Sequence, residues 1–436
     1  MWIVITLALI LRLIFFNQSL WLDESIEALA LQGHFGPLLS YSLSDFQPPL
    51  YHFILRSWTS LLGFSEISLR LPSLISGLMT VYFVLKIGEY LGGKKIGVIA
   101  GLLVATNPLL IYYSQEGRTY AMTTFFVTAS FYYFIKLLKS STINHRSSTI
   151  YYILYTILFL WTSYLSWFVL ITQAIYVIWK KRYDLLFIQT LSASTLVLWL
   201  PSLYHSLQIG LGDAVAIPGW GKVVGGVSLK ALALTWVKLN IGRISFDSNY
   251  LYGGIVSLLA ILHFYMLRHV RSKILFIWLV VPVVLASAVS LFVPIYSYTR
   301  VLFIVPAYLL LLALGSAKLS RVVIVCNTVF LMIFWVNPRF HKEDWRSLTN
   351  YLNTQSGTVT LPSLKQNAPF IYYGLSLTLQ SSQDPLATNK VFYVRYVEEA
   401  FDPGKLGQAN FAKSGYTITS QKSYSGIQLD IYEKWQ

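Results

Sequence analysis

Two adjacent carboxylates, Asp23 and Glu24, follow the first apolar run of the chain, residues 2–20. A carboxylate in a cavity can act as a general base or bind a divalent cation, and it is costly to bury in a membrane without a partner. A second interpretation stays open, because Asp23 is a suitable N-cap for a helix over residues 25–32 and acids are favoured at that end of a helix. The pair is therefore a candidate catalytic or metal site, or the start of a helix.

A third acid and an arginine lie in the segment SQEGRTY, residues 114–120. The segment joins two apolar runs with almost no loop, so Glu116 and Arg118 must lie at a membrane boundary if both runs cross the bilayer. A guanidinium binds phosphate oxygens in a planar fork, and a carboxylate can hold a divalent cation. The pattern indicates a phosphate-binding site formed by Arg118 and Tyr120 beside Glu116, or else a Glu–Arg pair that anchors a tight hairpin.

The segment QPPLYH, residues 47–52, begins a stretch whose apolar residues recur at helical spacing up to residue 62. This spacing, with prolines in the first turn, predicts an amphipathic helix that lies flat on the membrane. We expect Gln47, Tyr51 and His52 to line a substrate cavity. A helix that only shapes the cavity floor is the alternative.

Further basic residues stand near the ends of apolar runs. The segment PIYSYTR, residues 294–300, makes Tyr298 and Arg300 candidates for donor binding, although an arginine there can also snorkel to the interface. Arg12 lies within the first run and should face the interior of a helix bundle, without a direct catalytic role. The segment KEDWR, residues 342–346, follows the last run, and we expect it to brace an outer domain against the membrane core.

The elements that must position these residues belong to a membrane protein. The 436-residue chain is 55% hydrophobic and only 12% charged, with a net charge of +15. Soluble proteins contain about 25% charged residues, and the abundance of aromatic residues excludes a disordered chain. The basic residues form short clusters between apolar runs, which indicates contact with membrane lipids and excludes a nucleic-acid partner. P-loop and G-x-S-x-G motifs are absent, so neither an ATP-driven pump nor that type of hydrolase is indicated.

Runs of uncharged residues long enough to cross a hydrocarbon core of about 30 Å predict about eleven membrane-spanning helices. The run 147–179 is too long for one span, so we divide it near residues 161–167. The predicted spans lie in residues 2–20, 67–85, 96–115, 119–135, 147–160, 168–179, 185–204, 248–267, 274–299, 301–317 and 322–338.

The orientation follows from the basic residues of alternate short loops. Five such loops hold 14 Lys and Arg in 39 residues and should face the cytoplasm. They are residues 86–95, 136–149, 180–184, 268–273 and 318–321. The large loop 21–66, the turn 114–118, the loop 205–247 and the turn 294–300 then lie outside the cytoplasm. A multi-pass plasma-membrane protein with an extracytoplasmic site follows.

Residues 339–436 form a separate region with more charge and no membrane-length apolar run. Strand-like residues occur in 357–361, 391–396 and 417–432, between Gly, Ser, Asn and Pro turns. We therefore predict two domains: a transmembrane catalytic domain, residues 1–338, and a small extracytoplasmic α/β domain, residues 339–436.

The order of these motifs resembles a known family. A first span, a loop that begins W-x-D-E, then PPLYH, then the turn S-Q-E-G-R-x-Y, is similar to the polytopic GT-C glycosyltransferases. The similarity is greatest to the bacterial branch related to protein O-mannosyltransferases and lipid A aminoarabinose transferases. It covers the whole length, is strongest over residues 1–140, and includes the E-D-W-R of residues 343–346.

The resemblance implies a hexosyl- or pentosyltransferase that moves a sugar from a polyprenyl-phosphate carrier to an extracytoplasmic hydroxyl, with inversion. It implies that Asp23 is the catalytic acid of the first loop, with Glu24 its neighbour and Glu116 the second acidic position. It places Arg118 and Arg300 at the lipid phosphate, and a divalent cation of unknown identity on Asp23 and Glu116. One departure stands at YLSW, residues 164–167, where several relatives carry a histidine.

Other classes stay open at this point. A lipid or solute transporter, or a flippase with an anion-binding cavity on its outer face, would also use arginines and acids near the membrane. A lipid-linked polysaccharide polymerase or ligase is a further alternative. The acceptor is equally open between protein, glycolipid and polysaccharide.

Overall fold

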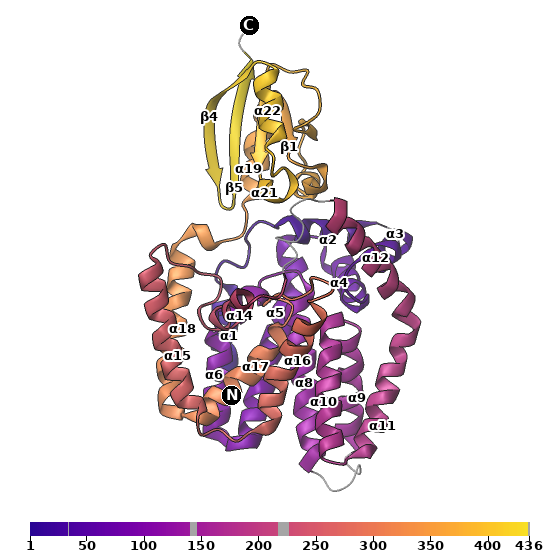
Figure 1. Cartoon of the computed structure of the whole chain (residues 1–436), viewed down its shortest axis with the longest axis vertical. Coiled ribbons are helices and arrows are strands. Elements are labelled where there is room, and N and C mark those ends of the chain that lie inside the picture. Colours follow the sequence, from indigo (N-terminus) through magenta and orange to yellow (C-terminus); the bar gives the residue numbers. More distant parts are fainter. Residues whose placement is uncertain (34, 140–145, 217–225, 435–436) are drawn as a thin grey trace.

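The computed structural model describes residues 1–33, 35–139, 146–216 and 226–434, with the backbone alone for residues 35, 37, 44 and 209–216. A helical body carries a small α/β domain at one end of the long axis (Figure 1). The helices of the first loop lie between the two (Figure 1). The arrangement matches the predicted mostly helical membrane protein with a small C-terminal domain.

Most helices of the body coincide with the predicted apolar runs. In the first half they are α1 (Trp2–Leu13), α2 (Leu22–Gln32), α3 (Phe35–Ser44), α4 (Leu50–Leu62), α5 (Glu66–Gly92), α6 (Lys94–Thr106), α7 (Pro108–Ser114), α8 (Thr119–Lys139) and α9 (Arg146–Leu160). In the second half they are η1 (Tyr164–Ser166), α10 (Trp167–Trp179), α11 (Tyr183–Ser194), η2 (Thr195–Trp199), α12 (Leu200–Ala216), α14 (Leu229–Ile241), α15 (Asn249–Leu267), α16 (Lys273–Val289), η3 (Leu302–Ile304), α17 (Val305–Gly315), α18 (Ala317–Val336) and η4 (Pro338–Phe340). Helices α2, α3 and α4 lie instead in the predicted loop 21–66, and α14 lies in the predicted loop 205–247.

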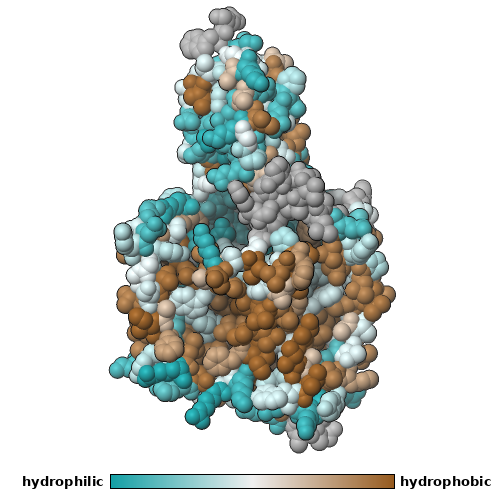
Figure 2. Space-filling model, viewed as in Figure 1, coloured by the Kyte–Doolittle hydropathy of each residue, from teal (hydrophilic) through white to brown (hydrophobic). Residues whose placement is uncertain are grey.

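Within the described residues, five helical segments are long and apolar enough to cross a membrane, and six if the bent pair α6–α7 is one span. The five are residues 66–92, 119–139, 183–208, 249–267 and 317–336. Helices also coincide with the other predicted spans, although several of them are shorter. The surface of the body carries a broad hydrophobic zone with hydrophilic residues at both of its edges (Figure 2). The fold thus contains membrane-spanning helices, and the total of eleven crossings stays a prediction.

Two expectations about the chain path need correction. The first helix does not extend over residues 2–20 but ends at Leu13. Side chains of other segments bind the carbonyl groups that follow: Gln115 binds that of Ile14, and Arg70 binds that of Phe16. Residues 205–247 are not all loop, because α12 continues into them and α14 forms after the Ser228 cap. The expected break in 147–179 is present between α9 and α10.

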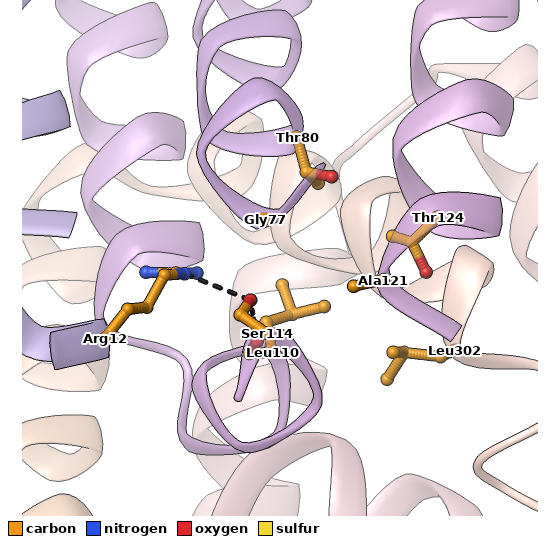
Figure 3. Close-up of a pocket in the computed structure, with 8 residues that line it drawn as sticks. All are labelled: Arg12, Gly77, Thr80, Leu110, Ser114, Ala121, Thr124 and Leu302. Atoms are coloured by element: carbon orange, nitrogen blue, oxygen red, sulfur yellow. Dashed lines mark hydrogen bonds between the residues drawn. The ribbon is translucent and has the colours of Figure 1, made fainter. Parts of the chain in front are cut away.

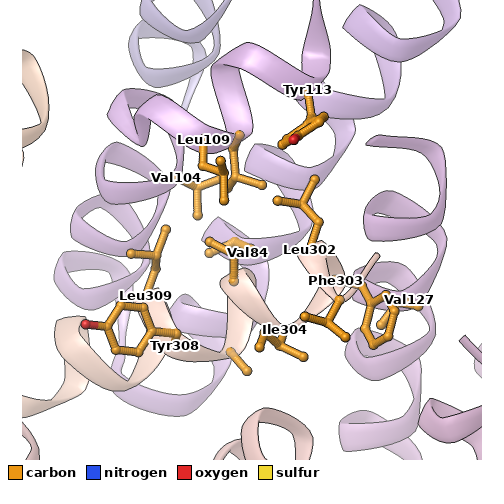
Figure 4. Close-up of a cluster of buried hydrophobic side chains, with 14 of the residues drawn as sticks. Val84, Val104, Leu109, Tyr113, Val127, Leu302, Phe303, Ile304, Tyr308 and Leu309 are labelled. Atoms are coloured by element: carbon orange, nitrogen blue, oxygen red, sulfur yellow. The ribbon is translucent and has the colours of Figure 1, made fainter. Parts of the chain in front are cut away.

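The long helix α5 packs against α6 at the centre of the body. Glycines allow this close approach, since a Cβ on Gly97 would lie 2.7 Å from the carbonyl oxygen of Leu85. Buried aliphatic and aromatic side chains from α5, α6, α7, α8, η3 and α17 fill the space beside this pair (Figure 4). Close packing of this kind stabilises helices in a bilayer, where the lipid is as apolar as the side chains.

The C-terminal domain contains one mixed five-stranded sheet in the order β2-β1-β3-β5-β4. The strands are β1 (Thr358–Leu361), β2 (Thr378–Ser381), β3 (Lys390–Arg395), β4 (Tyr416–Tyr424) and β5 (Ile427–Lys434). β1 pairs in parallel with β2 and β3, whereas β5 pairs antiparallel with β3 and β4. The helical segments are α19 (Trp345–Leu352), η5 (Leu364–Gln366), α20 (Ala368–Tyr372), α21 (Glu398–Phe401) and α22 (Leu406–Lys413). Its core, which includes Trp345, Val359 and Phe392, is separate from that of the body. The predicted strands are confirmed, and β2 is an addition.

Candidate active site at the start of the first loop

Glu24 is the buried centre around which the first loop is built. Its Oε1 accepts hydrogen bonds from Arg70 Nε at 2.9 Å and from the backbone N–H of Gly117 at 2.6 Å, and its side chain is only 1% exposed. Burial opposes the charge of this carboxylate, but Arg70, Lys342 and the Gly117 N–H outweigh it and lower the Glu24 pKa to about 2. Glu24 therefore stays ionised and joins the first loop to the 114–118 turn.

Arg70 holds the chain that leads into α2. Besides Glu24, its guanidinium donates to the carbonyl oxygens of Phe16, Gln18 and Ser19 at 2.6–3.1 Å. These bonds use the donors of the guanidinium on one carboxylate and three backbone groups. Arg70 thereby fixes the position at which α2 begins.

Asp23 points away from its neighbour, because consecutive residues of a helix lie about 100° apart around its axis. Its side chain is 38% exposed, and its Oδ2 lies 3.7 Å from Arg118 Nη2. Surrounding protein raises the Asp23 pKa by desolvation, and Arg118 opposes this effect. A helix does start here, but it begins at Leu22 with Trp21 as its N-cap, so the expectation that Asp23 is the N-cap of a helix over residues 25–32 is wrong. Asp23 lies instead in the first turn of α2, where an acid is favoured.

Glu116 faces inward and lies near Lys342. Lys342 Nζ is 3.7 Å from Glu116 Oε2 and 3.3 Å from Glu24 Oε1, and all three side chains are at most 2% exposed. Burial raises the Glu116 pKa, against the effect of Lys342. The brace expected from residues 342–346 is present, since Arg346 also contacts Glu66 at 2.6 Å.

Arg118 differs from Arg12 and Arg70, which are fully buried, because its side chain is 15% exposed and its guanidinium is not saturated with hydrogen bonds. Its Nη atoms lie 3.7 Å from Asp23 and 3.8 Å from Glu27, beyond hydrogen-bonding distance. Its buried Nε has no hydrogen-bond partner among the described residues. Arg118 thus has donors without an acceptor among the described residues, which makes it a candidate for binding a ligand. The donors of Arg70, by contrast, are occupied.

Arg12 has the saturated environment expected of a structural residue. Its guanidinium donates to Ser114 Oγ (Figure 3). It also donates to the carbonyl oxygens of Ala8, Val104 and Ala105. The helix pair α6–α7 bends by 62° next to these carbonyls, where Pro108 lacks the N–H that a continuous helix would donate to Val104. The small cavity in Figure 3 lies beside this contact, which stabilises a helix break.

Arg300 and Tyr120 line a common pocket. The other lining residues are Thr119, Thr123, Ser163, Thr299, Leu302 and Phe303. Arg300 is half-buried, and among the described residues its guanidinium donates to the carbonyl oxygen of Ile295 at 3.2 Å. Asp23 and Arg118 are among the charged groups that act on this guanidinium. Tyr298 is half-buried two residues earlier.

The three residues of the segment QPPLYH that we expected to line a cavity are buried. Tyr51 is fully buried, Gln47 is 8% exposed, and His52 is 1% exposed. Both ring nitrogens of His52 are engaged, at 2.6 Å to Glu27 Oε1 and at 3.1 Å to Asp45 Oδ2. In this structure the three side chains are therefore buried, and their role in lining a substrate cavity stays a prediction.

A divalent cation at Asp23 and Glu116 would need further oxygen or nitrogen ligands from nearby side chains. No group of three or more His, Cys, Asp or Glu side chains with metal-binding geometry occurs in the described ranges. The neighbours of Asp23 and Glu116 are the cations of Arg118 and Lys342. Asp23 and Glu116 therefore do not fit the predicted divalent-cation site.

Sequence reasoning missed part of the site. Arg70, Glu27 and Asp45 belong to none of the motifs that the sequence analysis singles out. Arg243, an exposed residue 4.8 Å over the ring of Tyr112, was not singled out. A charge within an apolar run, such as Arg70, is the signal that could have been followed.

The chain is similar to a known protein family in sequence and to solved structures in fold. The sequence profile of the family described as dolichyl-phosphate-mannose-protein mannosyltransferase matches residues 46–205. No curated protein matches the chain as a sequence.

Solved structures match over nearly the full length. ArnT from Cupriavidus metallidurans, in the apo state and bound to undecaprenyl phosphate, has 10% identity and a TM-score of 0.58, over 98% of this chain and 97% of ArnT. The oligosaccharyltransferase AglB from Archaeoglobus fulgidus, in complex with an inhibitory peptide and a dolichol-phosphate, has 10% identity and a TM-score of 0.54, over 100% of this chain and 74% of AglB.

The fold is therefore that of the GT-C membrane glycosyltransferases. The predicted resemblance to the GT-C glycosyltransferase branch related to protein O-mannosyltransferases and lipid A aminoarabinose transferases is confirmed.

Proposed function

We propose that the chain is a glycosyltransferase that transfers a sugar from a polyprenyl-phosphate donor to an acceptor hydroxyl outside the cytoplasm. The observation that carries this proposal is the pair Asp23 and Arg118: an accessible carboxylate 3.7 Å from a guanidinium with unused donors. A base beside a phosphate-binding cation is what such a transfer requires. The solved relatives named above, with undecaprenyl phosphate or dolichol-phosphate bound, support a lipid-phosphate ligand.

The donor phosphate would bind between Arg118 and Arg300. Its polyprenyl tail is too apolar to leave the bilayer, so the phosphate must remain at headgroup depth. The pocket with Arg300 and Tyr120 adds hydroxyl groups of Thr119 and Thr299 that can donate to phosphate oxygens. Tyr298 completes the predicted donor-binding set.

The reaction would be one in-line displacement. Asp23 accepts the proton of the acceptor hydroxyl while the oxygen forms a bond to the anomeric carbon. The bond between that carbon and the phosphate oxygen breaks, and its electron pair leaves with the polyprenyl phosphate, whose charge the arginines stabilise. The transition state has oxocarbenium character, as in glycoside hydrolysis, and a single displacement inverts the anomeric centre.

Glu24 and Glu116 take supporting roles in this proposal. Both carboxylates are buried beside Lys342, and Glu24 is bonded to Arg70 and Gly117. We assign them the task of fixing α2 and the 114–118 turn relative to each other. Asp23 alone then acts on the acceptor.

The site would open outside the cytoplasm, on the side of the sheet domain. The distribution of Lys and Arg in the alternate loops supports this orientation. A recess with hydrophilic walls lies between the sheet domain and the hydrophobic zone (Figure 2). An acceptor could enter there while the donor tail stays in lipid. No finding supports the transporter or flippase alternative.

The test is turnover of the purified full chain with a panel of polyprenyl-phosphate sugars. Mass analysis should detect consumption of one donor and release of polyprenyl phosphate. Asp23→Asn should lower turnover at least a hundredfold, the lower range for a general base, and leave folding intact. Asp247→Asn, which changes an exposed acid paired with Arg339, is the matched control and should keep activity. Retained turnover in Asp23→Asn would contradict the assignment.

A further inference from the structure

A chain of charged groups runs behind Arg118 through the first loop. Asp45 Oδ2 lies 3.1 Å from His52 Nε2, and His52 Nδ1 lies 2.6 Å from Glu27 Oε1. The second oxygen of Glu27 lies 3.8 Å from Arg118 Nη1. The chain comes from four separate places: α2, the end of α3, α4 and the 114–118 turn.

The carboxylates of Glu27 and Asp45 are largely buried, so their negative charges need a cation close by. Glu27 and His52 are each 1% exposed, and Asp45 is 13% exposed. Two carboxylates this close together in a protein interior repel each other unless a cation lies between them. An imidazolium between them donates one N–H to each carboxylate, whereas a neutral imidazole can donate only one. The geometry therefore fits a charged His52.

Glu27 is the link between His52 and the site. Its Oε1 is held by His52, and its Oε2 accepts from the Tyr41 hydroxyl at 3.1 Å. Both oxygens of the carboxylate are thus held in place, and Oε2 also faces the guanidinium of Arg118. A fixed negative charge at this distance orients the guanidinium without saturating it.

We propose that the bridge Asp45–His52–Glu27 is a positioning device that aims the unused donors of Arg118 at the donor phosphate, with His52 as its charged centre. This inference rests on the proposed function, because it takes Arg118 as the phosphate ligand. It replaces the expected role of His52 as a substrate contact with an indirect role. His52 is then a positioning residue and touches no reacting atom.

The test is a double-mutant cycle on ligand affinity, with undecaprenyl phosphate as the probe and the full chain in detergent. His52→Gln should weaken binding about tenfold when Arg118 is present, the middle of the range for coupled neighbours. In the Arg118→Lys background the same change should cost less than twofold, because the residue on which His52 acts has been replaced. Equal losses in both backgrounds, or no binding by the wild-type chain, would overturn the proposal.

Two further variants keep the test informative if His52→Gln folds poorly. Asp45→Asn keeps an acceptor for the His52 N–H and removes one charge, and it should weaken binding about threefold through the same dependence on Arg118. His263→Gln is the matched control, since His263 is also a buried histidine, bonded to Tyr308 at 2.7 Å in the body. It should change thermal stability and leave the affinity unchanged.

Turnover separates this inference from the proposed function. With a consumed donor, His52→Gln should raise KM for that donor, whereas loss of folded enzyme alone would lower the apparent kcat and leave KM unchanged. If the wild-type chain binds the probe but consumes no sugar donor, the proposed function fails while the binding cycle still decides the role of His52.

Discussion

Lys342 Nζ lies 3.3 Å from Glu24 Oε1, which joins the segment after the last membrane helix to the base of the first loop. The two residues are 318 positions apart in the sequence, and both are buried. Glu24 in turn is bonded to Arg70 and to the 114–118 turn. One carboxylate therefore ties together the start of α2, the start of α5, the turn before α8 and the entry to the sheet domain.

Lys342→Met should destabilise the protein by about 3 kcal/mol, because removal of one partner leaves buried carboxylates with less compensation. Thermal unfolding in detergent would measure the loss. The sheet domain should also become more accessible to protease at its junction with the body. Lys390→Met is the control: its partner Glu433 lies 3.3 Å away, but both side chains are more than a third exposed, so the cost should stay below about 1 kcal/mol. Equal shifts for the two variants would contradict the central role of Glu24.

The sequence could predict this site only in part, for a physical reason. Charge-free runs determine where helices can cross a membrane, and short acidic and basic motifs at their ends must then lie at its surface. Asp23, Glu24, Glu116 and Arg118 were found in this way. Which of two adjacent acids faces the cavity depends on the rotation of α2, and that rotation is set by Arg70 and Lys342.

The remaining differences arise from long-range contacts. Helix α1 ends at Leu13 although the apolar run continues, because Gln115 and Arg70 bind the carbonyls that follow. Strand β2 (Thr378–Ser381) carries little strand signal, and it forms by parallel pairing with β1. The bridge through His52 joins residues from separate helices, and no local pattern indicates it.

Arg70→Lys should be strongly destabilising even though it keeps the charge. The guanidinium bonds one carboxylate and three backbone carbonyls, and an ammonium group cannot reach them all in one plane. We expect a loss of about 3 kcal/mol in folding free energy, since buried acceptors lose their donors. Arg182→Lys is the control, because Arg182 pairs with Asp184 where the two side chains are 21% and 30% exposed. Its effect should remain within about 1 kcal/mol, and a loss as small for Arg70→Lys would contradict the role of Arg70.

Stability should depend on pH through His52. Burial opposes its charge, but Glu27 of α2 and Asp45 after α3 outweigh burial and raise the His52 pKa to about 10, above its ordinary 6.5. Tyr41 of α3, Tyr51 of α4 and, through Glu27, Arg118 also face it. A raised pKa gives a stabilisation that is complete below pH 6.5 and is lost as the pH rises through about 10.

The measurement is the difference in melting temperature between wild type and His52→Gln across pH 6 to 10.5. The difference in melting temperature should be largest at pH 6 and should shrink towards pH 10. The corresponding change in unfolding free energy should be about 2 kcal/mol. His341→Gln, a change in a histidine that lies outside the bridge, should give a difference that does not follow this course. A constant difference for His52→Gln would mean that its charge does not contribute.

Arg12 and Pro108 should be coupled, because Arg12 donates to carbonyls that the helix break leaves without a partner. Arg12→Ala should cost about 2 kcal/mol, the penalty for unsatisfied buried acceptors. Pro108→Ala restores a backbone N–H that can donate to the Val104 carbonyl if the helix straightens. The cost of Arg12→Ala in the Pro108→Ala background should therefore fall by at least half. Thermal unfolding of the four proteins in the cycle measures this coupling, and strictly additive losses would mean that Arg12 stabilises the bundle by contacts unrelated to the break.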